Sequence, residues 1–400
     1  MTPRISAGQR RARLARQHRL DEPAGSVAEA AEAMIALHAT DPTTVYLSAW
    51  ARTRCGGLAD VDQALYAERG IVRMLGMRRT MFVVPAPLAP VVQRACADDV
   101  ARRLRRTLEG QLSKGGPGGT SAVGEADVAT WLRDAGEGTL RALAARGSAS
   151  GAELAADEPR LRTLLVYEGD KAYGRTENIT SRLLMLLSAE GRIVRGHRRG
   201  GWSSGQFEWF PVEAWLPELH RGAPDAAAAR TELARRWLHG FGPAPVTDLQ
   251  WWAGWTAGQV KATLATLPVA EVDLDGQPGV ALASDLEPML AHAPAPGAAL
   301  LPGLDPTPMG WQSREWFLGP HGPQLFDRTG NIGPTVWWQG RVAGGWAQRA
   351  SGEVVVRLLE DIGSDAVAAV QAEASHLESW LGDLRVTPRF RTPLERELSA

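Results

Sequence analysis

The feature that most constrains the fold of this chain is a pattern of helices followed by two strands, which recurs between breaks rich in Gly and Pro. In the middle of the chain, the sequence predicts helices over 139–146 and 179–189, and a turn at 147–151 that opens another helix. Strands follow at 191–195 and 206–210, separated by a turn of Gly, Arg and Ser. Helices followed by a β-hairpin in this order are the winged-helix pattern.

The same order of elements occurs again further along the chain. Helices are predicted at 226–239, 246–252 and 256–267, and a hairpin at 270–274 and 280–283. The first hundred residues fit a looser version, with a strand at 78–84. After residue 296 the pattern becomes that of a β-sheet, and the chain closes with a helix over 364–381.

Breaks at 113–120, 222–225 and 293–297 separate these parts, because Gly and Pro interrupt both helices and strands. A chain of 400 residues is also too long for a single ordinary core. We therefore predict an α+β protein of four segments. These are a winged-helix-like domain at 1–112, a second winged helix with a basic wing at 120–221, a third at 225–292, and a β-rich region with a closing helix at 298–400.

The charge of the chain is balanced overall and uneven along its length. The net charge is −1 and the estimated pI is 6.7, which argues against a uniformly basic nucleic-acid-binding protein. However, residues 1–20 carry six arginines and no acid, and residues 192–199 carry four arginines and no acid. The composition therefore allows either a basic face for nucleic acid or a set of solvated charged helices.

Other sequence features point to a reduced compartment. The two cysteines, Cys55 and Cys96, do not make a disulfide framework. No secretory signal precedes Ala24, and no run of 18 apolar residues predicts a membrane span. We expect a cytoplasmic protein that associates with the nucleoid when bound, does not interact with membranes, and is a monomer.

The most informative short segment is Leu37-His38-Ala39-Thr40-Asp41-Pro42, which we call the corner. Ser26 and Glu29 read as a capping box, so a helix is predicted to begin there and run to Leu37. Pro42 cannot continue that helix but suits the first turn of another, predicted to reach residue 54. Asp41 is then placed as the N-cap of the second helix. The corner thus presents polar side chains on a rigid base.

The corner, together with Val45-Tyr46-Leu47, resembles the Leu-Gln-Ala-Gln-Asp-Pro corner of the AlkZ-like winged-helix DNA glycosylases. His38 and Thr40 stand where that family has its two glutamines. Further similar blocks occur in the same order along the chain, at Met77–Val84, Asp248–Gly254, Leu300–Pro306 and Asn331–Val336. The resemblance implies three tandem winged helices with a β-rich C-terminal region, arranged as a C around double-stranded DNA. It also implies cleavage of the N-glycosidic bond of a damaged base, without a cofactor.

For this chemistry, the residue types at the corner have definable roles. A purine alkylated at N7 already carries positive charge and leaves without an acid catalyst, through an oxocarbenium-like transition state. His38 would be the base or would position water, Thr40 would contact the water or the sugar, and Asp41 would help electrostatically. A position at a helix C-terminus would favour protonated His38 by about 0.3–1 kcal/mol, which opposes its use as a base.

The sequence also limits which other chemistries are possible. No lysine lies near the corner, so a monofunctional hydrolase is predicted rather than a Schiff-base lyase. The eight histidines show no metal-ligand spacing, and no phosphate-binding loop is present.

Several residues are candidates for binding DNA. The glycine-rich hairpin predicts phosphate or minor-groove contacts from Arg195, Arg198 and Arg199, with Trp202 as a wedge or stacking ring. The resemblance adds Arg78 and Arg79, and the C-terminal region adds Arg328 and Asn331.

Two other interpretations remain open. One is a non-catalytic, regulatory DNA-binding protein that kept the fold without the family's glutamines. The other is a protein-interaction module, because winged helices also mediate protein contacts.

Overall fold

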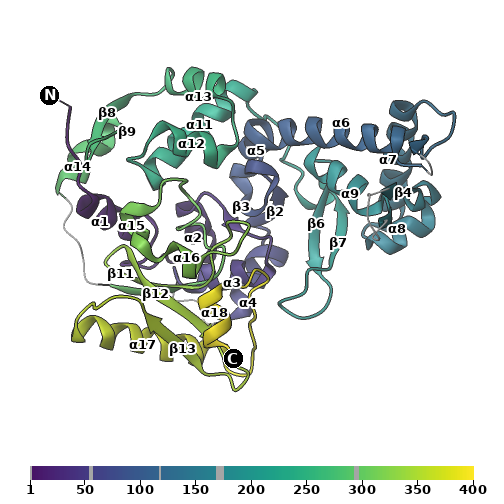
Figure 1. The fold of residues 1–400 in the computed structure, drawn as a ribbon. Coiled ribbons are helices and arrows are strands. Elements are labelled where there is room, and N and C mark those ends of the chain that lie inside the picture. The colour runs from purple at the N-terminus through teal and green to yellow at the C-terminus, as the bar shows by residue number, and fades with distance from the viewer. Residues whose placement is uncertain (1, 54–56, 117–118, 168–174, 292–296) are drawn as a thin grey trace. The chain divides into compact units, whose positions relative to one another are not determined.

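The computed structural model describes residues 2–53, 57–116, 119–167, 175–291 and 297–400 (Figure 1). Cys55 and parts of the predicted breaks at 113–120 and 293–297 lie outside these ranges. The chain divides into two compact units. Unit 1 comprises 1–72, 80–88 and 227–400, and unit 2 comprises 73–79 and 89–226.

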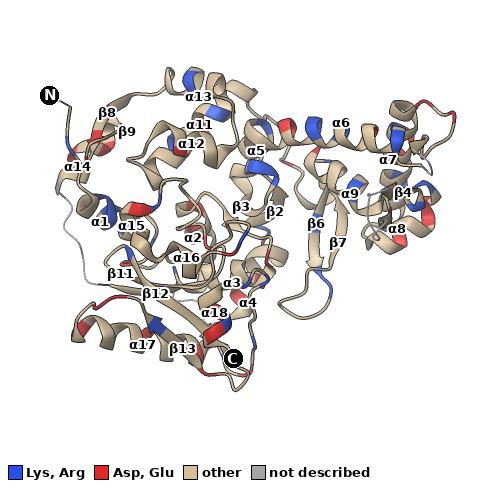
Figure 2. Cartoon of the chain, viewed as in Figure 1, with Lys and Arg blue, Asp and Glu red and all other residues tan. Residues whose placement is uncertain are grey.

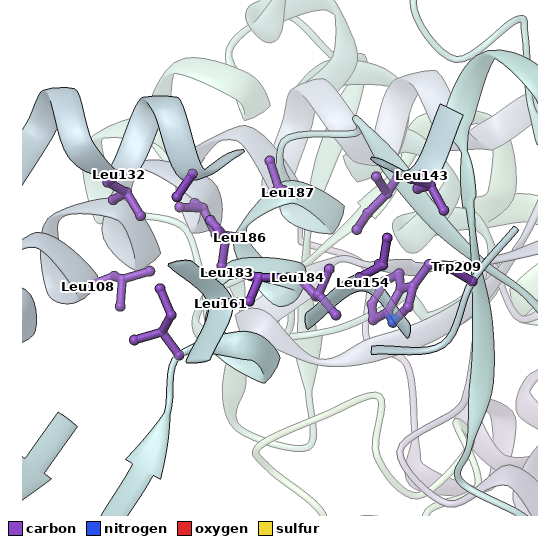
Figure 3. Close-up of a cluster of buried hydrophobic side chains, with 14 of the residues drawn as sticks. Leu108, Leu132, Leu143, Leu154, Leu161, Leu183, Leu184, Leu186, Leu187 and Trp209 are labelled. Atoms are coloured by element: carbon purple, nitrogen blue, oxygen red, sulfur yellow. The ribbon is translucent and has the colours of Figure 1, made fainter. Parts of the chain in front are cut away.

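Unit 2 is built from helices that pack around leucines, with a hairpin at the end. Its helices are α5 (Ala89–Val92), α6 (Asp98–Lys114), α7 (Val128–Arg146), α8 (Gly151–Asp157), α9 (Thr180–Ala189) and α10 (Val212–Trp215). Its strands are β4 (Leu164–Tyr167), β5 (Arg175–Asn178), β6 (Ile193–Arg198) and β7 (Phe207–Pro211). Figure 3 shows the core that these helices share, in which Leu183, Leu184, Leu186 and Leu187 of α9 are central.

The predicted order of helices and hairpin in this segment is present. Ser150 caps α8 and forms a capping box with Glu153, so the turn at 147–151 does open a helix. β6 pairs antiparallel with β7, with Val194 opposite Phe210. Glycine is required at position 196, because a Cβ there would lie 2.4 Å from the Phe210 ring.

The predicted boundary between 112 and 120 is wrong as a boundary between compact units. Leu108 and Leu112 of α6 belong to the same core as α7 and α9. Because α6 packs on both of these helices, residues 89–114 belong to unit 2 rather than to an N-terminal domain.

Unit 1 contains the two ends of the chain. Its N-terminal elements are α1 (Ala7–Gln17), α2 (Val27–Ala33), β1 (Leu37–His38), α3 (Pro42–Trp50), α4 (Leu58–Asp62) and β3 (Met81–Pro85). The unit border falls within β2 (Ile71–Leu75). The segment predicted as a third winged helix forms α11 (Ala226–Phe241), α12 (Val246–Ala253), α13 (Ala257–Leu264), β8 (Val269–Leu274) and β9 (Gln277–Leu282), followed by α14 (Leu286–Ala291).

The C-terminal part of unit 1 combines a four-stranded sheet with helices. β10 (Ala298–Leu301), β11 (Thr335–Trp338), β12 (Arg341–Gln348) and β13 (Val354–Leu358) form an antiparallel sheet in that order. The helices here are α15 (Glu315–Leu318), α16 (Gly322–Leu325), α17 (Ser364–Leu381) and α18 (Pro393–Leu398). α17 and α18 both pack on this sheet.

The predicted segments 225–292 and 298–400 are not separate from the N-terminal residues. Ile5 is fully buried with Val272 and Leu274 of the β8–β9 hairpin. The Arg13 guanidinium donates to Asp285 at 2.6 Å, and both side chains are nearly buried. Apolar burial and a buried ion pair therefore join the two parts into one unit.

None of the helices among the described residues is long and apolar enough to cross a membrane. The free thiol of Cys96 is buried. Charged residues of both signs are spread over the helices, and basic residues recur along α6 and at the far end of the β6–β7 hairpin (Figure 2).

Candidate functional site

The corner is a short strand followed by a helix, not a turn between two helices. Helix α2 ends at Ala33 instead of Leu37, and Ile35 has a positive φ of 64°. Leu37 and His38 form β1, which pairs with β3 so that His38 lies opposite Phe82. Hydrogen bonding to β3 therefore holds this backbone extended. The expectation that His38 lies at a helix C-terminus is wrong, and the dipole argument for a protonated ring does not apply.

His38 as a residue is 6% exposed, and its ring meets the Phe82 ring edge to face, with centroids 5.5 Å apart. Its Nδ1 accepts the backbone N–H of Thr40 at 3.4 Å. A nitrogen that accepts a hydrogen bond carries no proton, so this contact favours the neutral ring with the proton on Nε2. In this tautomer Nε2 donates a hydrogen bond.

Asp41 is the N-cap of α3, as the sequence predicts. Its Oδ1 accepts the N–H of Thr43 at 3.0 Å and the Thr43 hydroxyl at 2.8 Å. Its Oδ2 accepts the backbone N–H of Arg389 at 2.8 Å. Because both oxygens are engaged and the residue is buried, Asp41 holds the corner in shape. Its neighbour Thr40 is half-buried.

Polar contacts with residues 303–307 hold helix α3 in place. The Thr44 hydroxyl donates to the carbonyl of Gly303 at 2.7 Å. Asp305 accepts from Ser48 at 2.6 Å and from both terminal nitrogens of Arg52, at 2.8 and 2.6 Å. Arg52 and Asp305 are completely buried, so this pair anchors the helix that follows the corner.

A hollow lined by arginines lies next to the corner within unit 1. Its volume is about 720 Å³, and we call it the arginine hollow. It is lined by Phe326, Asp327, Arg328, Thr329, Arg389, Phe390, Arg391, Pro393 and Arg396. The guanidinium of Arg389 donates through Nη1 to the carbonyl of Thr40 at 3.2 Å, which connects the hollow directly to the corner.

The predicted residues Arg328 and Asn331 belong to a tight turn at one side of the hollow. Asp327 accepts from the Asn331 side chain at 2.9 Å and from the Thr329 hydroxyl at 2.9 Å. Desolvation by itself would raise the pKa of Asp327, but these hydrogen bonds, Asn331 first, outweigh it and lower the pKa to about 2. The ionised carboxylate thus orders the turn and leaves Arg328 exposed at its tip.

The remaining predicted DNA-binding residues all belong to unit 2. Arg195 lies on β6 and stacks over the Trp209 ring at 5.1 Å. Arg199 is exposed and pairs with Glu153 at 3.2 Å. Arg198 ends β6 and is half-buried.

Trp202 does not stand out from the tip of the hairpin as a wedge would. The residue is 8% exposed and counts among the buried core. Stacking on a base would require its ring to leave this environment, so the structure gives the wedge role no support.

Arg78 and Arg79 lie in a short turn of 3₁₀ helix, Met77–Arg79, with left-handed φ values of 52° and 63°. Arg79 is exposed and Arg78 is half-buried. A left-handed backbone at two successive bulky residues is uncommon and points to a locally constrained turn.

Sequence reasoning missed Arg389, Phe390, Arg391 and Arg396. The signal was present, because residues 385–396 carry four arginines and one acid around an Arg-Phe-Arg triplet. Within the described ranges, no group of His, Cys, Asp and Glu side chains is arranged to hold a metal ion.

Comparison with known proteins bears on both the fold and the family. The model of the DNA glycosylase AlkZ-like family matches residues 31–380 of this chain. The structure is similar to that of Streptomyces sahachiroi DNA glycosylase AlkZ, with a TM-score of 0.71 at 20% identity, covering 96% of this chain and 99% of that chain. No curated protein sequence gives a match. The likeness in structure confirms the predicted α+β fold.

Proposed function

Because this chain belongs to the AlkZ-like DNA glycosylase family, we propose that it hydrolyses the N-glycosidic bond of alkylated purines in double-stranded DNA. The observation that carries the proposal is the contact between the corner and the arginine hollow, made by Arg389 on Thr40. This contact supports the proposal, because it joins Thr40, a candidate water-binding residue, to a cationic surface suited to DNA. The proposed reaction is monofunctional and needs no cofactor.

The chemistry required of the protein is modest when the base is already cationic. An N7-alkylated purine leaves as a neutral base, and the sugar develops positive charge in the transition state. The site must then exclude most solvent, orient one water towards the anomeric carbon, and stabilise the cation. N7-alkylated guanine, including bulky adducts, is the substrate class that fits this scheme, because the scheme assigns no residue as a general acid for the leaving base.

The corner residues take separate roles in this scheme. The His38 ring orients the attacking water, and the Thr40 hydroxyl, which can both donate and accept, holds the same water or the sugar. The water bonds to the anomeric carbon as the bond to the neutral base breaks, and the proton that it loses passes to solvent. Asp41 acts mainly as a positioning group, because both of its oxygens are engaged in holding Thr43 and Arg389. Its negative charge, one residue from Thr40, also favours a cationic sugar.

The test is release of N7-methylguanine from methylated duplex DNA, measured by chromatography under single-turnover conditions. Wild type should release the base, His38→Ala should lose most of the rate, and Thr40→Gln should retain it. His376→Ala is the matched control, since His376 is exposed on α17 and outside the corner. Absence of release from N7-methylated and bulky N7-alkylated substrates, with DNA binding intact, refutes the proposal.

That result would favour the second candidate, a non-catalytic DNA-binding protein. The observation that supports this candidate is the replacement of both family glutamines by His38 and Thr40. It predicts salt-dependent DNA binding, no base release, and no effect of His38→Ala on binding.

A further inference from the structure

The arginine hollow holds more positive charge than its own carboxylates neutralise. Arg391 is paired with Glu395 at 2.7 and 3.1 Å. Asp327 is engaged with its own turn, and its single negative charge offsets only part of the positive charge of the arginines. Among the described residues, no ion pair is made by the guanidinium groups of Arg328, Arg389 or Arg396, and all three residues are exposed. Three like charges around one hollow repel each other, so an anion there would relieve the repulsion.

We propose that the arginine hollow binds a phosphate of the DNA backbone, and that Arg389 positions the corner when this phosphate is bound. The proposal rests on the proposed function, because it takes DNA as the ligand. A guanidinium presents several N–H donors in a planar fork that matches two oxygens of a phosphate. Within the part of the chain that the structure describes, only one of these donors of Arg389 is used, by the carbonyl of Thr40. The others remain to bind the phosphate.

Arg389 differs from Arg328 and Arg396 because it reaches the corner through two bonds. Its backbone N–H donates to Asp41 at 2.8 Å, and its Nη1 donates to Thr40 at 3.2 Å. A phosphate that fixes the Arg389 guanidinium therefore also fixes the carbonyl of Thr40. Arg328 and Arg396 line the hollow without such bonds, so they should contribute to affinity alone.

The first experiment measures binding to an undamaged duplex over a range of salt concentrations, so it does not depend on catalysis. Arg328→Gln, Arg389→Gln and Arg396→Gln are compared with Arg349→Gln, whose exposed guanidinium pairs with Glu353 away from the hollow. Each lost phosphate contact should reduce the slope of log K against log salt by about 0.9 and weaken binding roughly fivefold. Slopes equal to that of Arg349→Gln in all three variants would overturn the phosphate site.

The second experiment separates a phosphate contact from a merely structural role. A duplex carrying one methylphosphonate linkage, placed in turn at each position around the lesion, removes a single backbone charge. At one position this should weaken wild type and Arg349→Gln roughly fivefold, yet leave Arg389→Gln unaffected, because the lost charge has no partner there. If the methylphosphonate weakens the binding of wild type, Arg349→Gln and Arg389→Gln equally at every position, Arg389 contacts no phosphate.

Positioning by Arg389 is tested by the single-turnover rate at saturating protein. Arg389→Gln should lower this rate roughly tenfold, Arg389→Lys should recover part of it, and Arg349→Gln, outside the hollow, should leave it unchanged. Equal rates for Arg389→Gln and wild type contradict positioning. If wild type releases no base, the proposed function fails. The binding of wild type and Arg389→Gln to the methylphosphonate duplexes then still decides whether the hollow binds phosphate.

Discussion

Replacement of Asp305 by Ala should destabilise unit 1 far more than removal of any surface acid. The carboxylate is completely buried and accepts from Ser48, from Arg52 twice, and from the backbone N–H of Thr307 at 2.9 Å. Asp305→Ala leaves the positive charge of Arg52 inside the protein with only the Ser48 carbonyl and the Thr307 hydroxyl as partners.

The size of the effect follows from the burial of both partners. Removing one member of a buried ion pair costs about 3–5 kcal/mol, because the remaining charge has lost both its water and its partner. An exposed pair contributes about 0–1 kcal/mol. Glu353→Ala is the matched control, because the Arg349–Glu353 pair has a similar distance of 2.7 Å but is roughly half exposed. The double variant Arg52→Met/Asp305→Leu removes both charges and should recover most of the lost stability.

The assay is denaturant unfolding followed by the fluorescence of the 15 tryptophans, several of which are buried in unit 1. Asp305→Ala should lower the free energy of unfolding by about 4 kcal/mol, and Glu353→Ala by less than about 1 kcal/mol. Because α3 follows the corner, base release should fall together with stability. A loss from Asp305→Ala no larger than that from Glu353→Ala would show that this pair does not anchor α3. A double variant as unstable as Asp305→Ala would contradict the assignment of the loss to an uncompensated charge.

His38→Ala should slow base release about 100-fold, whereas His38→Gln, which still donates and accepts, should stay within about tenfold of wild type in the single-turnover assay; equal losses would exclude water orientation by this side chain. Burial first, and then the charge of Arg52, hold the pKa of His18 well below its ordinary 6.5, so the unfolded chain binds more protons than the folded one below pH 6.5. The free energy of unfolding should therefore fall as pH drops below 6.5, by up to about 1.4 kcal/mol per pH unit. Denaturant unfolding of His18→Gln at several pH values should lack this dependence on pH. Asn331→Ala should raise the pKa of Asp327 from about 2 towards its ordinary 3.8 in a carboxylate NMR titration, and an unchanged pKa would mean that the Asn331 side-chain hydrogen bond does not set it.

Local rules predicted the elements whose boundaries depend on neighbouring residues. Asp41 followed by Pro42 specifies a helix start through hydrogen bonds within two residues, and the structure has this cap. Helix α17 runs over the predicted 364–381 because apolar residues recur with helical spacing. The hairpin of β8 and β9 also lies within a few residues of its predicted position.

Local rules failed where a distant segment competes for the backbone. Residues 34–37 were predicted as the end of a helix, but β3, more than forty residues away, pairs with Leu37 and His38 and keeps these two residues extended. The same applies to Trp202, whose place in a glycine-rich loop suggested exposure and whose ring is buried. Neither hydrogen bonding between distant segments nor burial can be read from a short stretch of sequence.

The sequence alone determined that helices and hairpins alternate, that the last hundred residues contain strands and a closing helix, and that His38, Thr40 and Asp41 share one rigid corner. These follow from spacing and capping, which act over a few residues. Only the tertiary structure decided that Arg389, 348 residues from Asp41, hydrogen-bonds to that corner, so that the arginine hollow lies next to it. The physical reason is that burial of apolar residues and of the Arg52–Asp305 pair fixes how distant segments meet, and no local pattern of residues specifies that meeting.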